Sequence, residues 1–133
     1  MPPERAEPGS PADWLARAES NLLLAQQPKP AGALWEDLCF QSQQAAEKAL
    51  KAVLIAHGIP FRFTHSIEAL LDLMPADVPV AADLRAAAKL TDYAVMSRYP
   101  GDYPPVTEEE YRDALRHART VVSWARRMVQ ASA

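Results

Sequence analysis

The chain of 133 residues is long enough for one hydrophobic core and too short for two. Its net charge of −3 disfavours a protein that coats nucleic acid through overall positive charge, and its single cysteine excludes an intramolecular disulfide and a cysteine-based zinc site. The sequence has neither a membrane-length apolar run of about 18 residues nor an apolar N-terminal signal region, so we expect no membrane association and a cytoplasmic location.

The first half of the chain contains two predicted helices. Residues 1–11 are rich in proline and are expected to form a disordered leader. A helix is predicted over residues 12–27, and Pro28 follows its end. Residues 34–57 have no internal glycine or proline and are rich in alanine, leucine, glutamate, glutamine and lysine, so they predict the central helix. One face of this helix is apolar, with a stripe of small residues that would let another helix approach closely. The opposite, polar face holds Gln44, Glu47, Lys48 and Lys51.

A non-helical connector is predicted after the central helix. Residues 59–64 contain Pro60, which prevents a continuous helix, and we expect them to be extended. Thr64 is predicted to cap a short amphipathic helix that ends at Pro75.

Two further helices complete the predicted fold. One spans residues 80–98, and its expected inward positions are Leu84, Ala87, Ala88, Thr91 and Val95. The last helix opens with a capping box formed by Thr107 and Glu110 and continues to about Gln130. We therefore expect an all-α protein, an up-and-down four-helix bundle over residues 12–130 with an additional short helix.

Arg98 is the first candidate for a binding residue. It ends a predicted helix at a loop rich in proline and glycine and is flanked by Tyr99, Asp102 and Tyr103. A guanidinium beside aromatic rings can bind a phosphate through two hydrogen bonds and stack on a base. The alternative interpretation is structural: Arg98 would cap the last carbonyl groups of the helix, and the tyrosines would pack on the end of the bundle.

Other chemistry has weaker support in the sequence. His65 lies at the start of the short helix, which suits a local structural role or a site near the end of the bundle. The acidic run 108–110 stabilises the N-terminus of the last helix rather than binding metal. Glycine-rich phosphate loops and paired metal-ligand motifs are absent, so we expect neither a cofactor nor a metal.

Residues 39–51, CFQSQQAAEKALK, resemble the signature helix of HEPN-domain proteins. The motifs at 13–15 (DWL), 64–67 (THSI) and 97–100 (SRYP) occur in the expected order around it. The resemblance covers nearly the whole predicted bundle. It implies four to five helices, usually a homodimer, and often a minimal nucleotidyltransferase partner in toxin–antitoxin or related modules.

Many proteins of this family are metal-independent ribonucleases with an Arg-x(4–6)-His motif, in which histidine acts on the ribose 2′-hydroxyl or the leaving group. In this chain the positions at that distance from Arg98 hold a tyrosine and two prolines (103–105), so the expected histidine is missing. A formal match exists between Arg112 and His117. It lies inside a predicted helix, where five residues turn the two side chains about 140° apart.

The resemblance and the missing histidine together favour a non-enzymatic role. We expect a HEPN-like homodimer that binds a nucleotide, a nucleic acid or a nucleotidyltransferase partner through the end of the bundle that contains Arg98. Gln44 and Lys48 are further candidates for this binding, and their alternative interpretation is that they are ordinary solvated residues.

Two other functions stay open. One is a metal-independent ribonuclease toxin that uses Arg98 with His65 or Tyr103, or that uses the pair Arg112 and His117. The other is a purely structural adaptor whose surface makes only protein contacts. Loss of ligand or RNA binding in Arg98→Ala would separate the binding module from the structural adaptor.

Overall fold

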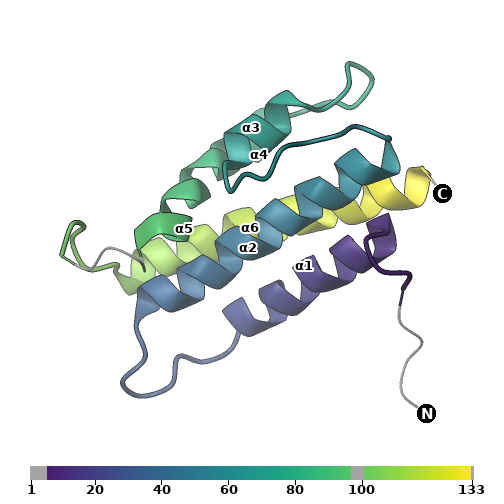
Figure 1. Ribbon diagram of the computed structural model, residues 1–133. Helices are drawn as coiled ribbons and strands as arrows, with labels where there is room; N and C mark the ends of the chain where they lie inside the picture. Colours follow the sequence, from purple (N-terminus) through teal and green to yellow (C-terminus); the bar gives the residue numbers. More distant parts are fainter. Residues whose placement is uncertain (1–5, 97–100, 133) are drawn as a thin grey trace, which may run out of the picture.

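The computed structural model describes residues 6–96 and 101–132, and every regular element within them is helical. The helix α2 (Trp35–Ala56) lies at the centre and packs most extensively against α1 (Pro11–Ala25) and α6 (Glu108–Ala131) (Figure 1). The short helix α3 (Ile67–Asp72) and residues 82–96 cover another side of α2. Within these described ranges, no helix has the length and apolar character needed to cross a membrane. The predicted all-α bundle with an additional short helix is confirmed.

Small side chains on α2 allow its neighbours to approach closely. Ala45, Ala49 and Ala52, which belong to the predicted small-residue stripe, have no exposed surface. Leu50 and Leu54 of the same helix are also fully buried and fill the core beside them. Close approach and complete burial make α2 the element around which the other helices pack.

A left-handed glycine ends α2 and sets the direction of the following chain. Gly58 has a φ of +67°, a conformation that is accessible to glycine and strained for other residues. The N–H of Ile59 donates to the carbonyl oxygen of Leu54 at 2.9 Å, which closes the turn typical of a helix C-terminus. The chain therefore reverses, and residues 59–66, which we call the connector, run back along α2 before α3 begins (Figure 1).

The helix α3 begins at Ile67, and the predicted cap at Thr64 is wrong. The cap is Ser66, whose Oγ accepts the N–H of Ala69 at 3.1 Å. Thr64 Oγ1 accepts the N–H of Ser66 at 3.0 Å and so closes the turn that ends the connector. The N–H of Ile67 donates to Thr91 Oγ1 at 3.0 Å, which fixes the start of α3 against the chain that follows it.

The predicted single helix over residues 80–98 is also wrong, because its described part is divided into three pieces. These are α4 (Ala82–Ala86), the 3-10 helix η1 (Ala87–Asp92) and α5 (Tyr93–Met96). A 3-10 helix has three residues per turn, so it buries side chains at a spacing of three where an α-helix would rotate them away. Val95, which was expected to face the core, is 38% exposed. The buried side chains of this region are those of Leu84, Ala87, Leu90 and Ala94.

Candidate functional site

Charged and polar side chains meet beneath the connector at the middle of α2. Glu47 and Lys51, expected on the polar face, have side chains that are only 4% and 5% exposed, and Lys51 Nζ lies 2.9 Å from Glu47 Oε2. His65, at the end of the connector, places Nδ1 2.7 Å from Glu47 Oε1. Gln43 Nε2 donates to Glu47 Oε1 and to the carbonyl oxygen of His65, both at 3.1 Å. We call these residues (Gln43, Glu47, Lys51 and His65) the Glu47 cluster.

The carboxylate of Glu47 is held in its ionised form. Burial alone would raise the pKa of Glu47, but hydrogen bonds from Lys51, His65 and Gln43 outweigh burial and lower the pKa below its ordinary value. A carboxylate only accepts hydrogen bonds, so His65 donates from Nδ1 and its other ring nitrogen, Nε2, is the basic one. The cluster is therefore a buried ion pair that also fixes the orientation of an imidazole ring.

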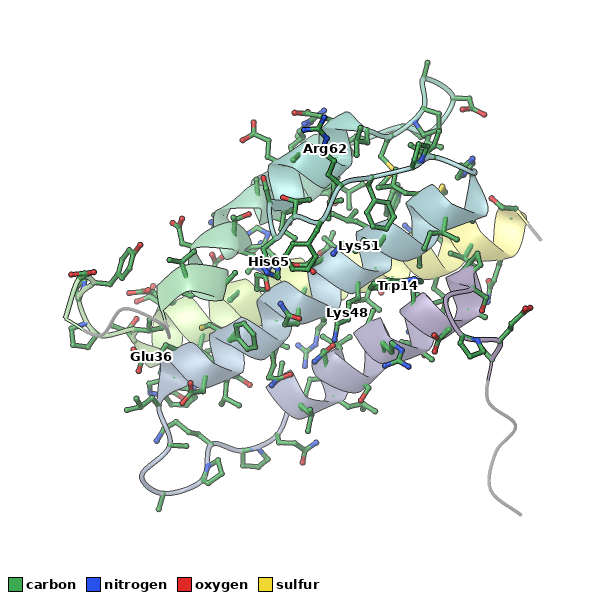
Figure 2. All side chains as sticks on the ribbon, viewed as in Figure 1. Trp14, Glu36, Lys48, Lys51, Arg62 and His65 are labelled. Carbon is green, nitrogen blue, oxygen red and sulfur yellow. The ribbon has the colours of Figure 1, made fainter. Side chains whose placement is uncertain are left out.

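Three aromatic rings surround the ammonium group of Lys51. Its Nζ lies 5.6 Å from the ring centroids of Trp14 and Phe61 and 5.7 Å from that of Phe63, distances at which the rings attract a cation. The rings of Trp14 and Phe61 also meet edge to face, 6.5 Å apart. Trp14, Lys51 and His65 come from α1, α2 and the connector and gather over the middle of α2 (Figure 2).

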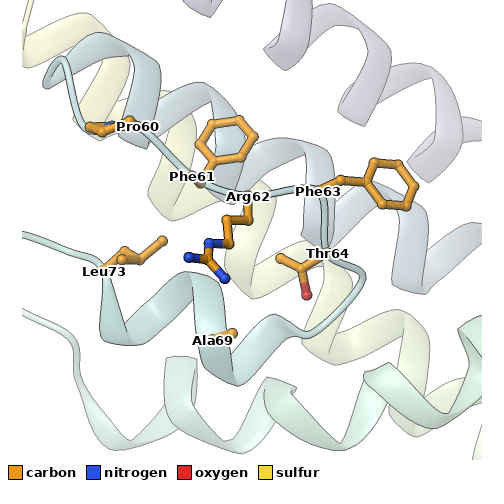
Figure 3. Close-up of a pocket in the computed structure, with 7 residues that line it drawn as sticks. All are labelled: Pro60, Phe61, Arg62, Phe63, Thr64, Ala69 and Leu73. Atoms are coloured by element: carbon orange, nitrogen blue, oxygen red, sulfur yellow. The ribbon is translucent and has the colours of Figure 1, made fainter.

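The connector directs alternate side chains to opposite sides. Phe61 and Phe63 lie on the side of Lys51, whereas Arg62 projects toward α3 (Figure 3). This alternation is the ordinary consequence of an extended backbone. Arg62 lies in an open groove of about 720 Å³ between the connector and α3. The groove is also lined by Pro60, Phe61, Phe63, Thr64, Ala69 and Leu73.

The candidates on the polar face, Gln44 and Lys48, lie beside the Glu47 cluster. Gln44 Nε2 donates to Gln43 Oε1 at 2.7 Å, which connects Gln44 directly to the cluster. Lys48 Nζ donates to Asn21 Oδ1 at 2.9 Å, and Asn21 Nδ2 donates to Gln41 Oε1 at 2.7 Å. Two groups of hydrogen-bonded polar side chains therefore lie on this surface: one belongs to the Glu47 cluster, and the other joins α1 to α2.

Three cationic side chains, those of Arg17, Lys48 and Lys51, lie near one another on this surface. Arg17 is paired with Asp13 at 3.1 Å. Burial lowers the pKa of Lys48, the negative charge of Glu47 opposes this change, and the weaker effects of the positive charges of Arg17 and Lys51 lower the pKa further. The carboxylate of Glu47 is itself bound by Lys51. Lys48 bonds to the neutral amide of Asn21 rather than to a carboxylate, so its charge favours the binding of an anion.

The other predicted site residues are not part of this arrangement. Arg98 and Tyr99 lie outside the described residues. Asp102 and Tyr103 lie in the loop before α6 and are exposed, and Tyr103 has 41% of its surface accessible. The loop lies near the N-terminus of α2, whereas the Glu47 cluster lies at the middle of this helix (Figure 1).

The pair formed by Arg112 and His117 is not brought together. The side chain of Arg112 is 73% exposed and bonds to Glu108 at 2.9 Å. The side chain of His117 is 8% exposed, its Nε2 lies 3.5 Å from Asp113 Oδ2, and this nitrogen has no hydrogen-bond partner among the described residues. Burial lowers the pKa of His117, so the ring is neutral at physiological pH. One side chain therefore faces water while the other lies in the protein interior.

The part of the chain that the structure describes contains no group of three histidine, cysteine, aspartate or glutamate side chains able to hold a metal ion. Cys39 has no exposed surface, and burial raises the pKa of its thiol to about 12. The negative charge of Glu110 raises this pKa further, and a hydrogen bond with Tyr93 opposes the change. A thiol in this state is neither a nucleophile nor a ready metal ligand at neutral pH.

The Glu47 cluster predicts that acid destabilises the fold. Because the pKa of Glu47 is below its ordinary value of 4.5, its ionised form contributes stability that is present above that pH and lost as the pH falls through the folded-state pKa. We expect the urea midpoint of the wild type to fall below about pH 4.5 more steeply than that of the double variant Glu47→Leu/Lys51→Met. Circular dichroism measured in urea from about pH 3 to about pH 7 tests this expectation, and equal pH profiles would contradict it.

Comparison with known proteins identifies the family. The family model described as HEPN domain matches residues 11–128. The crystal structure of TT1696 from Thermus thermophilus is similar, with 37% sequence identity, a TM-score of 0.81, and coverage of 90% of this chain and 98% of that one. The structure of ST0689, an archaeal HEPN homologue, is also similar, with 31% identity, a TM-score of 0.72, and coverage of 90% and 98% of the two chains. No match was found among curated proteins. The chain belongs to the HEPN family.

Proposed function

We propose that this HEPN protein is a cytoplasmic homodimer that binds a nucleotide or a nucleic acid and does not act on it chemically. The observation that supports this most directly is the charge of Lys48 on the surface along α1 and α2, which we call the positive surface. Lys48 bonds to the neutral amide of Asn21, and its pKa is lowered first by burial and more weakly by the nearby Arg17 and Lys51. Net charge is negative over the whole chain, so attraction of a phosphate must come from such a local cluster. Gln44 offers an amide beside these charges for hydrogen bonds to a base or a sugar.

The absence of a complete ribonuclease motif also agrees with a binding role. No histidine follows Arg98 at the required distance, and the formal match between Arg112 and His117 has one exposed and one buried member. We propose in addition that the homodimer, a common state of HEPN domains, associates with a minimal nucleotidyltransferase, as the family resemblance implies. Light scattering of the 14.7 kDa chain and co-purification with a co-expressed nucleotidyltransferase test these two associations separately.

A metal-independent ribonuclease of a toxin–antitoxin module is the second candidate function. One observation favours it: the buried carboxylate of Glu47 binds His65 through Nδ1, which leaves Nε2 to accept a proton from a ribose hydroxyl. Arg98 would then stabilise the charge on the phosphate. Cleavage of RNA by the metal-free wild type, and its loss in His65→Ala and Arg98→Ala, would establish this function in place of binding alone.

Loss of the Lys48 charge should weaken RNA binding through its ionic component. For a single strand, each released counterion contributes about 0.7 to the slope of log affinity against log salt concentration, so we expect Lys48→Gln to reduce the slope by about that amount. Fluorescence anisotropy with a labelled single-stranded RNA at several salt concentrations measures the slope. Lys89→Gln, which removes a half-exposed lysine on η1, is the matched control and should leave the slope unchanged.

The same titrations separate the three functions. Saturable RNA binding without cleavage supports the binding module. A lower affinity in Arg98→Ala would indicate that the Arg98 end of the bundle also contacts the RNA. Binding by the wild type with the same slope in Lys48→Gln would contradict the assignment of the positive surface. Association with a protein partner in the absence of any RNA or nucleotide binding would establish a structural adaptor.

A further inference from the structure

We propose that Phe63 is a base-stacking platform and that the connector binds single-stranded nucleic acid. This inference rests on the proposed function and specifies both the class of ligand and the segment that binds its base. Phe63 is 85% exposed, whereas Phe61, two residues earlier on the same side of the connector, is half-buried against Trp14. A large apolar ring left in water beside a cationic surface is the feature that the rest of the fold does not explain.

The ring is exposed although the backbone around it is fixed. The carbonyl oxygen of His65 accepts a hydrogen bond from the buried Gln43, and the N–H of Ser66 donates to Thr64 Oγ1. These bonds hold the two residues that follow Phe63 in place. A ring presented by a fixed backbone loses little conformational entropy when a planar ligand stacks on it.

Two neighbours hold the Phe63 ring in position. The ring of His65 meets it edge to face with centroids 5.0 Å apart and an interplanar angle of 78°, and Lys51 Nζ lies 5.7 Å from its centroid. His65 and Lys51 are themselves fixed by Glu47. Glu47 is therefore a positioning residue for the platform, and the exposed remainder of the ring is free to stack on a base.

Positive charge lies on both sides of the platform. Arg62 projects toward α3, and no ion pair of its guanidinium is found among the described residues (Figure 3). Lys48 lies on the other side, along α1 and α2, together with Arg17, which is paired with Asp13 at 3.1 Å. A phosphate backbone that crosses the connector beside a stacked base would meet cations before and after it.

An exposed Phe63 ring with cations on both sides favours the binding of a single strand over a duplex. An aromatic side chain flanked by cations binds unpaired bases of any sequence, because every base has a π-face and the phosphates are common to all. Bases inside a duplex are stacked on each other and present only their edges in the grooves. The sequence-tolerant recognition of a single strand is therefore the expected property.

The experiment compares affinity for short homopolymeric single strands and for a duplex of the same length by fluorescence anisotropy. We expect Phe63→Ala to weaken single-strand binding about tenfold without changing the salt slope, because stacking is not ionic, and Phe63→Trp to retain the affinity. Arg62→Gln should instead reduce the slope by about 0.7. Leu24→Ala, which truncates an exposed side chain on α1, is the control for loss of apolar surface and should bind like the wild type.

The outcomes distinguish failure of this inference from failure of the proposed function. Wild type that binds neither nucleotides nor RNA overturns both. If the wild type binds single strands and Phe63→Ala binds them equally well, the platform is overturned and the proposed function stands. Equal affinity of the wild type for the single strand and the duplex has the same consequence. If affinity falls in Tyr103→Ala and not in Phe63→Ala, the stacked base lies at the loop before α6 and not at Phe63. A lower mass of Phe63→Ala in light scattering, with affinity unchanged, would assign the ring to the dimer interface instead.

Discussion

Glu47→Leu should lower the free energy of unfolding by about 3–5 kcal/mol, because it leaves a buried charge without its partner. The side chain of Lys51 is 5% exposed, and its ammonium group would lose the carboxylate that lies 2.9 Å away. His65 and Gln43 would lose their acceptor at the same time. Urea unfolding followed by circular dichroism at neutral pH measures the effect.

Two controls separate this mechanism from simple loss of a side chain. The double variant Glu47→Leu/Lys51→Met replaces both charges by apolar groups and should be far more stable than the sum of the single variants predicts. Glu108→Leu removes a carboxylate from an exposed ion pair with Arg112 at the same i, i+4 spacing and should lower stability by only about 0.2–1 kcal/mol. Additive effects in the double variant would show that the buried ion pair is not the source of the loss.

Leu50→Ala should lower the free energy of unfolding by about 2–5 kcal/mol, since it opens a cavity in the centre of the core. Leu50 has no exposed surface and lies on the helix that packs against both α1 and α6. The urea midpoint should fall while the dependence of the unfolding free energy on urea stays the same.

The matched control is Leu34→Ala, the same substitution at a position that is 56% exposed. It should change stability by less than about 0.5 kcal/mol. A small loss in Leu50→Ala would show that neighbouring side chains move into the vacated space and that α2 is less tightly packed than its burial indicates.

Local rules predicted the helices whose signals are contained in their own sequence. The central helix agrees with its prediction to within a residue at each end, because its composition favours helix and Gly58 ends it. The cap of α6 also agrees: Thr107 Oγ1 accepts the N–H of Glu110 at 3.1 Å. The division of residues 82–96 into three pieces could not be predicted this way. It accompanies burial at a spacing of three and the bond from Ile67 to Thr91, both of which depend on how this segment packs.

The candidate site was predicted only in part, for a related reason. Gln44 and Lys48 were recognised from their place on the polar face of the central helix, and they do lie beside the Glu47 cluster. The same pattern predicts exposure for Glu47 and Lys51, but the connector and Trp14 of α1 pack over them. The sequence does contain a signal for this burial: Phe61 and Phe63 alternate around Arg62. Such alternation indicates an extended segment with one apolar side, which packs against another part of the protein.

The single cysteine gives this protein a built-in means of finding its ligand. Cys39 is the only thiol in the chain and has no exposed surface, so an alkylating reagent reaches it only when the core opens. The rate of labelling under native conditions therefore reports the frequency of that opening. A molecule that binds the folded form suppresses opening in proportion to its occupancy, whatever its chemical nature. Protection of Cys39 can thus be used to screen nucleotides, oligonucleotides and protein partners with one assay and no added label.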